Sequence, residues 1–226
     1  MNPAGRSHEA ARRNEDAAGF VLAGGQSSRM GFDKALVEFS GQPLVVHALS
    51  ILRKARLPAS IGGAQAELGS FAPVIPDAVP GQGPLGGICA ALAATSARHA
   101  VFVSVDAPFV PPSLLEYLLY HARLTGSPVS IASVNGFDQT FPAVIDRAAL
   151  PALQAELLAG RLGAFSAFQA AAASLGQPIG RVFAEFLAQA GQVLSANGLP
   201  PIRWFFNLNT SADLKRAAAL AARRIG

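Results

Sequence analysis

Four short segments of this 226-residue chain combine glycine with charged or amide side chains in patterns that can do chemistry. The first runs from Leu22 to Lys34, where Gly24-Gly25 follows an apolar run and Arg29 and Lys34 add positive charge. Paired glycines let the backbone approach a ligand, and successive N–H groups can point at phosphate oxygens. Cations in the same loop would neutralise a triphosphate. This segment therefore predicts a phosphate-binding loop, although an ordinary strand-to-helix turn would also use the glycines.

The second segment is Val103 to Pro111, in which Asp106 follows the apolar run Ala100 to Val105. A carboxylate at the end of a central strand lies where open α/β sheets bind their ligands. Mg²⁺ takes one or two carboxylates together with phosphate oxygens. Asp106 is therefore a candidate magnesium ligand, and the alternative is a carboxylate that caps a turn before proline.

Two further segments offer recognition groups. Asp77 precedes the glycine-rich start of a predicted helix, which includes Gly86, and a carboxylate there could accept hydrogen bonds from a base. Asn207 and Asn209 lie two positions apart, so on an extended segment they project to the same face. The alternatives are a plain loop around Asp77 and a helix cap at Asn209 or Thr210.

The elements around these residues alternate between strands and helices. Apolar runs at Ala18 to Ala23 and Ala100 to Val105 predict strands that are buried on both faces, and helical segments follow at 43–56, 84–94 and 112–125. We expect an α/β fold with three layers, Rossmann-like, around a mostly parallel central sheet. Toward the end of the chain the pattern predicts a helix over 181–190 and a strand over 204–208. Residues 1–17 are interpreted as a flexible tail and residues 18–226 as a single domain.

Composition excludes several classes of protein. Half of the residues are hydrophobic and 14% are charged, but no uninterrupted apolar stretch is long enough to span a membrane, and the N-terminus lacks the apolar core of a secretory signal. The single cysteine, Cys89, excludes a disulfide framework and fits a cytoplasmic protein. The net charge of +4 comes largely from the N-terminal tail and the last helix, so we expect no nucleic-acid partner and no membrane partner.

The run LAGGxSxRMGxDKAL, from Leu22 to Leu36, resembles the signature of the molybdenum cofactor guanylyltransferases, members of the nucleotidyltransferase superfamily. The resemblance extends over 18–220. It implies that GTP binds to Leu22, Ala23, Gly24 and Lys34, with Gly25 and Arg29 beside them. It also implies that Asp106 binds Mg²⁺, in a segment similar to the family's D-x-P-F/Y-x-P stretch. The D…GPLxG pattern places Asp77 on the nucleotide, with Gly86 as a supporting backbone contact.

The acceptor side follows from the same resemblance. The family's N-x-N-T-P-E-D-L motif implies that Asn207 and Asn209 lie near the pterin, and a Gly-Arg context implies the same for Arg161. The expected reaction transfers GMP from GTP to molybdopterin and releases pyrophosphate, with Lys34, Arg29 and Asp106 as the catalytic residues. Transient contact with proteins that deliver or accept the cofactor is also expected.

Two departures from the family leave alternatives open. Where the family often has a Ser/Asn-Arg stretch that contacts the nucleotide, this chain has residues 61–65, Ile-Gly-Gly-Ala-Gln, and the segment 177–201 is longer than expected. A cytidylyltransferase, another nucleotidyltransferase with a phosphorylated acceptor, or a nucleotide-binding relative without catalysis remain as alternatives. A dinucleotide-binding oxidoreductase is disfavoured because no G-x-G-x-x-G motif follows a strand.

Overall fold

The computed structural model describes residues 16–23, 34–63, 66–79, 81–195 and 198–222. The glycine loop predicted to bind phosphate lies mostly outside these ranges, since residues 24–33 are not described, and so do residues 1–15 of the predicted tail. Strand β1, Ala17–Leu22, begins one residue earlier than the predicted domain. Ala17 therefore belongs to the sheet and not to the tail.

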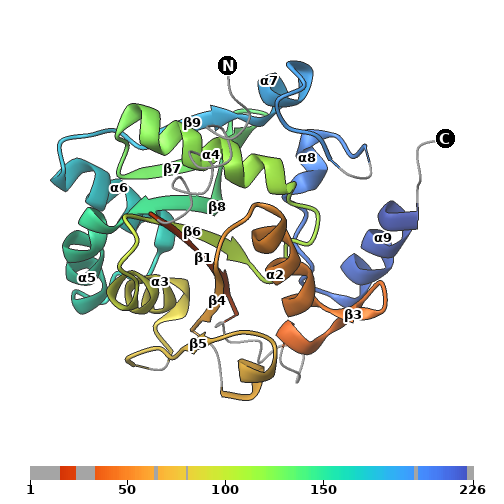
Figure 1. The fold of residues 1–226 in the computed structure, drawn as a ribbon, viewed down its shortest axis with the longest axis horizontal. Coiled ribbons are helices and arrows are strands. Elements are labelled where there is room, and N and C mark those ends of the chain that lie inside the picture. Colours follow the sequence, from red (N-terminus) through yellow and green to blue (C-terminus); the bar gives the residue numbers. More distant parts are fainter. Residues whose placement is uncertain (1–15, 24–33, 64–65, 80, 196–197, 223–226) are drawn as a thin grey trace, which may run out of the picture.

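A seven-stranded sheet forms the centre of the molecule (Figure 1). Its strand order is β5-β4-β1-β6-β8-β7-β9, and only β8 runs antiparallel to its neighbours. The remaining strands are, in chain order, β4 (Ala59–Gly62), β5 (Val74–Ile75), β6 (His99–Ser104), β7 (Val129–Val134), β8 (Phe137–Asp146) and β9 (Gly180–Phe183). The mostly parallel α/β sheet predicted from the sequence is confirmed.

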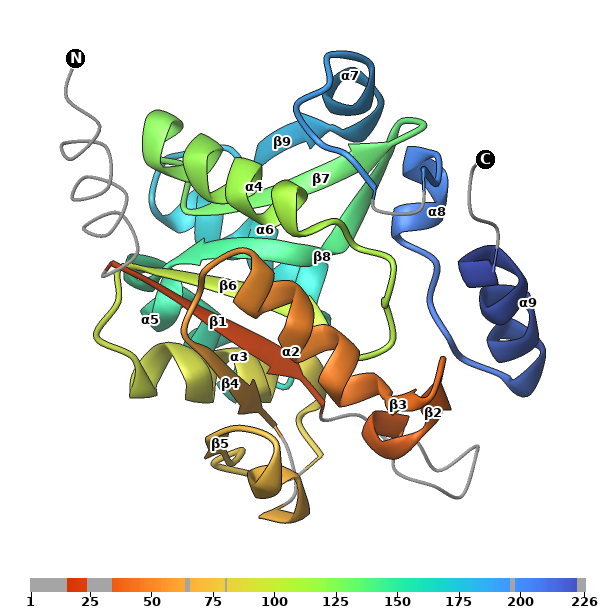
Figure 2. The same ribbon diagram turned by 45° about the vertical axis from the view of Figure 1, so that its right-hand side comes forward.

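Helices cover both faces of this sheet, which gives the expected three layers. On one face α2 (Leu44–Lys54) and α4 (Pro112–Thr125) pack over the strands, and on the other lie α3 (Gly83–Ala94), α5 (Leu150–Leu158) and α6 (Ala164–Ser174) (Figure 2). The buried apolar side chains form two clusters accordingly, one on each side of the sheet. Strand β1 and residues 100–103 of β6 are apolar because each contributes side chains to both clusters.

The order of the strands fixes where a ligand can bind. From β1 the chain goes outward to β4 and β5 and then returns to the other side of β1, where it forms β6. The carboxyl ends of β1 and β6 therefore flank the point at which the topology reverses, and open α/β sheets bind their ligands at this point. Within the ranges that the structure describes, no helix combines the length and the apolar character needed to cross a membrane.

The last part of the chain differs from the prediction. The helix predicted over 181–190 is shorter in the structure. Its first residues belong to β9, which pairs in parallel with β7, and Ala184–Gln189 form the helix α7. The predicted strand over 204–208 is wrong: Pro201–Trp204 form a short helix, α8, and an irregular segment follows. Proline at the first helical positions favours this turn, and the Trp204 indole is buried and donates a hydrogen bond to the Leu199 carbonyl.

The chain ends in α9 (Ser211–Ala222), which both views place beside the small two-stranded sheet of β2 (Glu38–Phe39) and β3 (Gln42–Pro43) (Figures 1 and 2). Ala217 of α9 is fully buried in the same apolar cluster as α2 and α4. The C-terminal segment is thereby brought back to the carboxyl edge of the sheet, next to the segment that follows the glycine loop.

Candidate active site

Lys34 lies at the centre of a polar cluster at the carboxyl edge of the sheet. It begins a short 3₁₀ turn, Lys34–Leu36, directly after the glycine loop. Its ammonium donates one hydrogen bond to Asp106 Oδ2 at 2.6 Å and another to Asn209 Oδ1 at 2.7 Å. Three residues separated by up to 175 positions in the sequence therefore meet at one nitrogen atom.

Asp106 is held by contacts on each side. The Ser104 hydroxyl donates to Asp106 Oδ1 at 2.5 Å, and the Leu208 backbone N–H donates to the Asp106 carbonyl at 2.9 Å. The side chain of Asp106 is 16% exposed, so it can still meet a ligand. Because β6 ends at Ser104, the carboxylate projects just beyond the strand, in the position predicted from the sequence.

The segment 207–209, which contains both asparagines, is positioned by the buried side chain of Leu208 and by the cap at the start of α9. Leu208 is buried, whereas Asn207 and Asn209 on either side of it are exposed, so the two amides share a face as the spacing predicts. Thr210 and Asp213 form a reciprocal cap at the start of α9, and Asp213 Oδ2 also accepts from the Asn209 N–H at 3.2 Å. These hydrogen bonds, led by that from the Thr210 hydroxyl, lower the pKa of Asp213 and keep it ionised.

The supporting roles of Ser104, Asp213 and the Leu208 backbone were not predicted from the sequence. A signal for Asp213 was present, because Thr-x-x-Asp is the spacing of a capping box. Ser104 lies two positions before Asp106, which places both on one side of an extended chain. The hydrogen bond from Leu208 to Asp106 has no signal in the sequence, since it joins backbone groups 102 positions apart.

A second polar site surrounds Asp77, which follows β5. Asp77 Oδ1 is buried and accepts no hydrogen bond from the part of the chain that the structure describes. Burial raises the pKa of this carboxyl above its ordinary value. A buried acceptor without a donor is costly, so a ligand that brings N–H groups would relieve the cost.

Glycines let the backbone approach Asp77 closely. Gly63 adopts a positive φ of 69°, and a Cβ built on it would lie 3.1 Å from Asp77 Oδ1. Gly86, in the first turn of α3, faces the same carboxyl, because its Cβ would lie 3.7 Å from Asp77 Cγ. A Cβ on the next residue, Gly87, would approach the Gly63 Cα to 3.4 Å.

Leu22 connects the two sites. Its carbonyl accepts from the Val105 N–H, next to Asp106, and its side chain lies 3.3 Å from the position of a Cβ on Gly87. The Ala23 N–H donates to the Gly62 carbonyl at 3.2 Å, so this amide is used within the protein. Leu22 thus contacts the residue next to Asp106 and a glycine of the Asp77 site, and the roles of Leu22 and Ala23 in nucleotide binding stay predictions.

The remaining predicted residues are not part of these two groups. Arg161 follows α5, is 60% exposed and makes two hydrogen bonds of 2.6 Å to Glu156. No hydrogen bond or ion pair of the described residues links it to Lys34, Asp77 or Asp106, and its role toward the acceptor stays a prediction. Gly24, Gly25 and Arg29 lie outside the described residues.

The order of the parallel strands β5-β4-β1-β6 reverses at β1, and a lysine and an aspartate lie at that point. Together with the match to a family model, this defines the protein as an α/β enzyme of the nucleotidyltransferase class. The chain belongs to the family described as the MobA-like NTP transferase domain, whose model matches residues 19–174. The resemblance inferred from the sequence is thereby confirmed, and so is the enzyme class.

Individual relatives agree with this assignment. The chain is 28% identical to a probable molybdenum cofactor guanylyltransferase of Pelotomaculum thermopropionicum over 91% of its own length and 93% of that protein. It is 40% identical to the molybdenum cofactor guanylyltransferase of Rhizobium johnstonii over 53% of its length, and the alignment spans 58% of the relative. Among solved structures, molybdopterin-guanine dinucleotide biosynthesis protein A of Archaeoglobus fulgidus superposes with a TM-score of 0.72 at 25% identity, covering 91% of this chain and 98% of that one.

Proposed function

We propose that the protein transfers GMP from GTP to the phosphate of molybdopterin, in the cytoplasm, and releases pyrophosphate. An oxygen of the acceptor phosphate attacks the α-phosphorus of GTP, and the bond from that phosphorus to the β-phosphate oxygen breaks. The convergence of Lys34, Asp106 and Asn209 on one nitrogen atom is the observation that supports this function most. It joins a residue of the predicted triphosphate loop, a candidate metal ligand and a residue of the predicted acceptor segment.

Lys34 supplies charge where the reaction needs it. An ammonium group has three N–H donors, and the bonds to Asp106 and Asn209 hold this one at the carboxyl edge of the sheet. There it can donate to phosphate oxygens of GTP and stabilise the negative charge that builds up in the transition state. Arg29 and the backbone of Gly24 and Gly25 are proposed to complete the phosphate loop.

Asp106 is the residue that would hold Mg²⁺. The site fits this ion because a carboxylate is a hard oxygen ligand and Asp106 remains 16% exposed beside Lys34, so a cation bound to phosphate oxygens can still reach it. Among the described residues no group of three or more histidine, cysteine, aspartate or glutamate side chains gathers to bind a metal. Asp106 would therefore share the ion with phosphate oxygens, and the ion would offset the charge of the triphosphate.

The two remaining parts of the site would position the substrates. Asp77 is proposed to accept hydrogen bonds from the N1–H and the amino group of guanine, which would satisfy its buried oxygen. Asn207 and Asn209 would contact molybdopterin, with Arg161 as a further acceptor contact. The chain itself needs no covalent intermediate, because bringing the two substrates together and stabilising charge account for the reaction.

The test is the Mg²⁺-dependent release of pyrophosphate from GTP and from CTP, each with and without molybdopterin. We expect release only with GTP and molybdopterin together, and a loss of at least about 100-fold in the Asp106→Asn variant, which keeps the size of the side chain. A preference for CTP, or release that does not depend on the pterin, would contradict the proposal. The same enzyme assayed without added divalent ions and with a chelator tests the need for the metal.

A further inference from the structure

The slot around Asp77 contains a second polar side chain, that of Gln82, which precedes α3. A Cβ built on Gly86 would lie 2.8 Å from Gln82 Cβ, 3.5 Å from Gln82 Oε1 and 3.7 Å from Asp77 Cγ. The amide of Gln82 and the carboxyl of Asp77 therefore both lie beside Gly86, and Gln82 can pack there only because residue 86 has no Cβ. Gln82 is partly buried, and no side chain of the described residues hydrogen-bonds to its amide.

The surroundings of Asp77 and Gln82 are apolar or bare backbone. Leu22 lies on one side, with its Cδ2 atom 3.7 Å from the position of a Cβ on Gly62 and 3.3 Å from that on Gly87. The backbone of Gly62, Gly63 and Gly87 forms the other contacts, without side chains. An apolar side chain, bare backbone and two polar groups at one end are the combination that binds a purine by its faces and reads its polar edge.

The polar edge of guanine matches these two groups. It carries the O6 acceptor next to the N1–H and amino donors, and a carboxylate can take both donors. A donor is then needed beside the carboxylate for O6. The Gln82 amide supplies one, because rotation about its terminal C–C bond exchanges the positions of its NH₂ and its oxygen.

We infer that Gln82 is a specificity-determining residue that donates a hydrogen bond to O6 of the guanine base next to Asp77. This inference rests on the proposed function. It gives the chain a base contact from the residue before α3, next to Asp77 and Gly63. The role assigned to Gly86 follows: without a Cβ, it lets the Gln82 side chain pack beside Asp77.

The experiment compares Gln82→Ala with Gln154→Ala, an exposed glutamine on α5 that serves as the matched control. The substrates are GTP, inosine triphosphate, which keeps O6 but lacks the amino group, and 2-aminopurine riboside triphosphate, which keeps the amino group but lacks O6. We expect Gln82→Ala to raise KM about tenfold for GTP and for inosine triphosphate, with kcat unchanged, and to leave KM for the 2-aminopurine nucleotide unaltered. Gln82→Glu, which places a second acceptor against O6, should raise KM for GTP further.

The outcomes separate the inference from the proposed function. If Asp77→Asn loses the preference for GTP but Gln82→Ala keeps the wild-type ratio between GTP and the 2-aminopurine nucleotide, the inference is wrong and guanine reading by Asp77 stands. An equal loss for all three nucleotides in Gln82→Ala would show a structural role and would also overturn the inference. If neither variant alters base preference, guanine reading in this slot fails as well. Thermal unfolding of each variant confirms that the measured protein is folded.

Discussion

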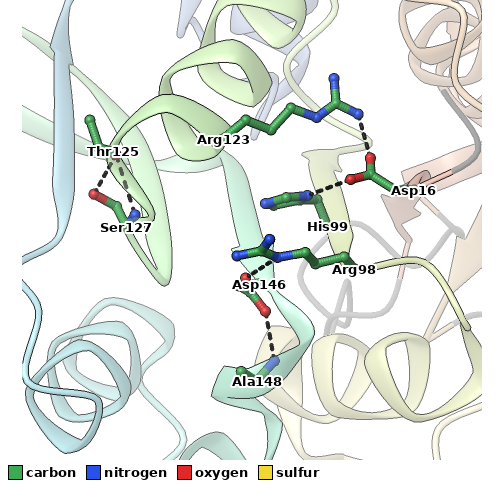
Figure 3. Close-up of polar contacts among 8 residues, drawn as sticks. All are labelled: Asp16, Arg98, His99, Arg123, Thr125, Ser127, Asp146 and Ala148. Carbon is green, nitrogen blue, oxygen red and sulfur yellow. Dashed lines mark hydrogen bonds and ion pairs between the residues drawn. The ribbon is translucent and has the colours of Figure 1, made fainter. Parts of the chain in front are cut away.

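The two ends of the central sheet carry polar clusters built from similar residue types in different ways. At the carboxyl edge, Lys34 and Asp106 are each partly exposed, with side-chain exposures of 20% and 16%. At the opposite edge, His99 begins β6 with 2% exposure, and Asp16 lies against it with 3.6 Å between Oδ2 and the ring Nδ1 (Figure 3). We call the first edge open because it holds the proposed ligand site, and the second closed because its charges pair with one another around a buried ring. The Asp16, Arg123 and Arg98 side chains of the closed edge are themselves 47%, 26% and 63% exposed.

The closed cluster consists of ion pairs that join separate elements. Arg123 of α4 pairs with Asp16 before β1 at 2.5 Å, and Arg98 pairs with Asp146 at the end of β8 at 2.9 Å (Figure 3). The Asp146 carboxylate also caps the turn after β8 through the Ala148 N–H. These contacts fasten the amino ends of β1 and β6 to α4 and β8.

The comparison shows that the charged residues which stabilise the fold and those proposed to act on the substrate lie at opposite edges of the sheet. Charges that hold the fold together are paired with protein partners at the edge away from the reversal point, whereas charges at the reversal point remain within reach of a ligand. Changes at the carboxyl edge should therefore affect turnover more than stability, and changes at the other edge should do the reverse.

The largest expected effect is the loss of turnover in Lys34→Ala. The variant removes the ammonium that is proposed to stabilise the transition state, so kcat/KM should fall about 100- to 1,000-fold. The free energy of unfolding should change by less than about 1 kcal/mol, because a partly exposed ion pair contributes little. Pyrophosphate release and urea unfolding measure the two quantities. Lys54→Ala, at the exposed end of α2, is the matched control, and an equal loss of activity there would remove the contrast.

The converse change is His99→Ala, at the closed edge. Removing a buried ring leaves a cavity, so we expect the free energy of unfolding to fall by about 2–3 kcal/mol. The turnover number per folded molecule should remain that of the wild type. Urea unfolding and the pyrophosphate assay at a temperature well below the transition test this. Loss of turnover in a fully folded His99→Ala sample would show that the two edges are coupled.

A smaller effect concerns pH. Burial lowers the pKa of His99 below its ordinary value of 6.5, and the opposing attraction of Asp16 only partly compensates. Since the folded protein holds the proton less tightly than the unfolded chain, the contribution of neutral His99 is complete above about pH 6.5 and is lost as the pH falls toward the folded-state pKa. The wild type should therefore lose more stability than His99→Ala between pH 7.5 and pH 5.5, by up to about 1 kcal/mol. Parallel stability curves for the two proteins would contradict this assignment.

The smallest expected effect concerns Asp77, where one substitution should change the melting temperature and GTP binding in opposite directions. Burial raises the pKa of Asp77, so ionisation of this carboxyl opposes folding as the pH rises above its ordinary value of 3.8. Asp77→Asn should raise the melting temperature slightly at pH 7, and this gain should disappear near pH 3.8. The same variant should bind GTP less well. A melting temperature that falls at pH 7 would mean that Asp77 has a structural partner.

Much of this arrangement could be predicted from residue types and spacing. The runs that became β1 and β6 are apolar because both faces of a central parallel strand are buried. The position of Asp106 after β6, and the glycines before Lys34, indicated a phosphate site at the carboxyl edge. The predictions failed between residues 177 and 208, where short apolar segments such as Trp204 to Leu208 have no length or period that distinguishes a strand from a turn.

The sequence by itself determined the α/β class, the family and the identity of the polar residues, because these depend on local pattern and motif. Only the tertiary structure decided that Asn209 and Asp106 share one lysine, that Leu208 holds the Asp106 backbone, and that Gln82 and Asp77 both lie beside Gly86. The physical reason is that these contacts depend on how the strands are ordered and on how the C-terminal segment returns to the carboxyl edge of the sheet. Such long-range packing brings residues together that no spacing along the chain connects.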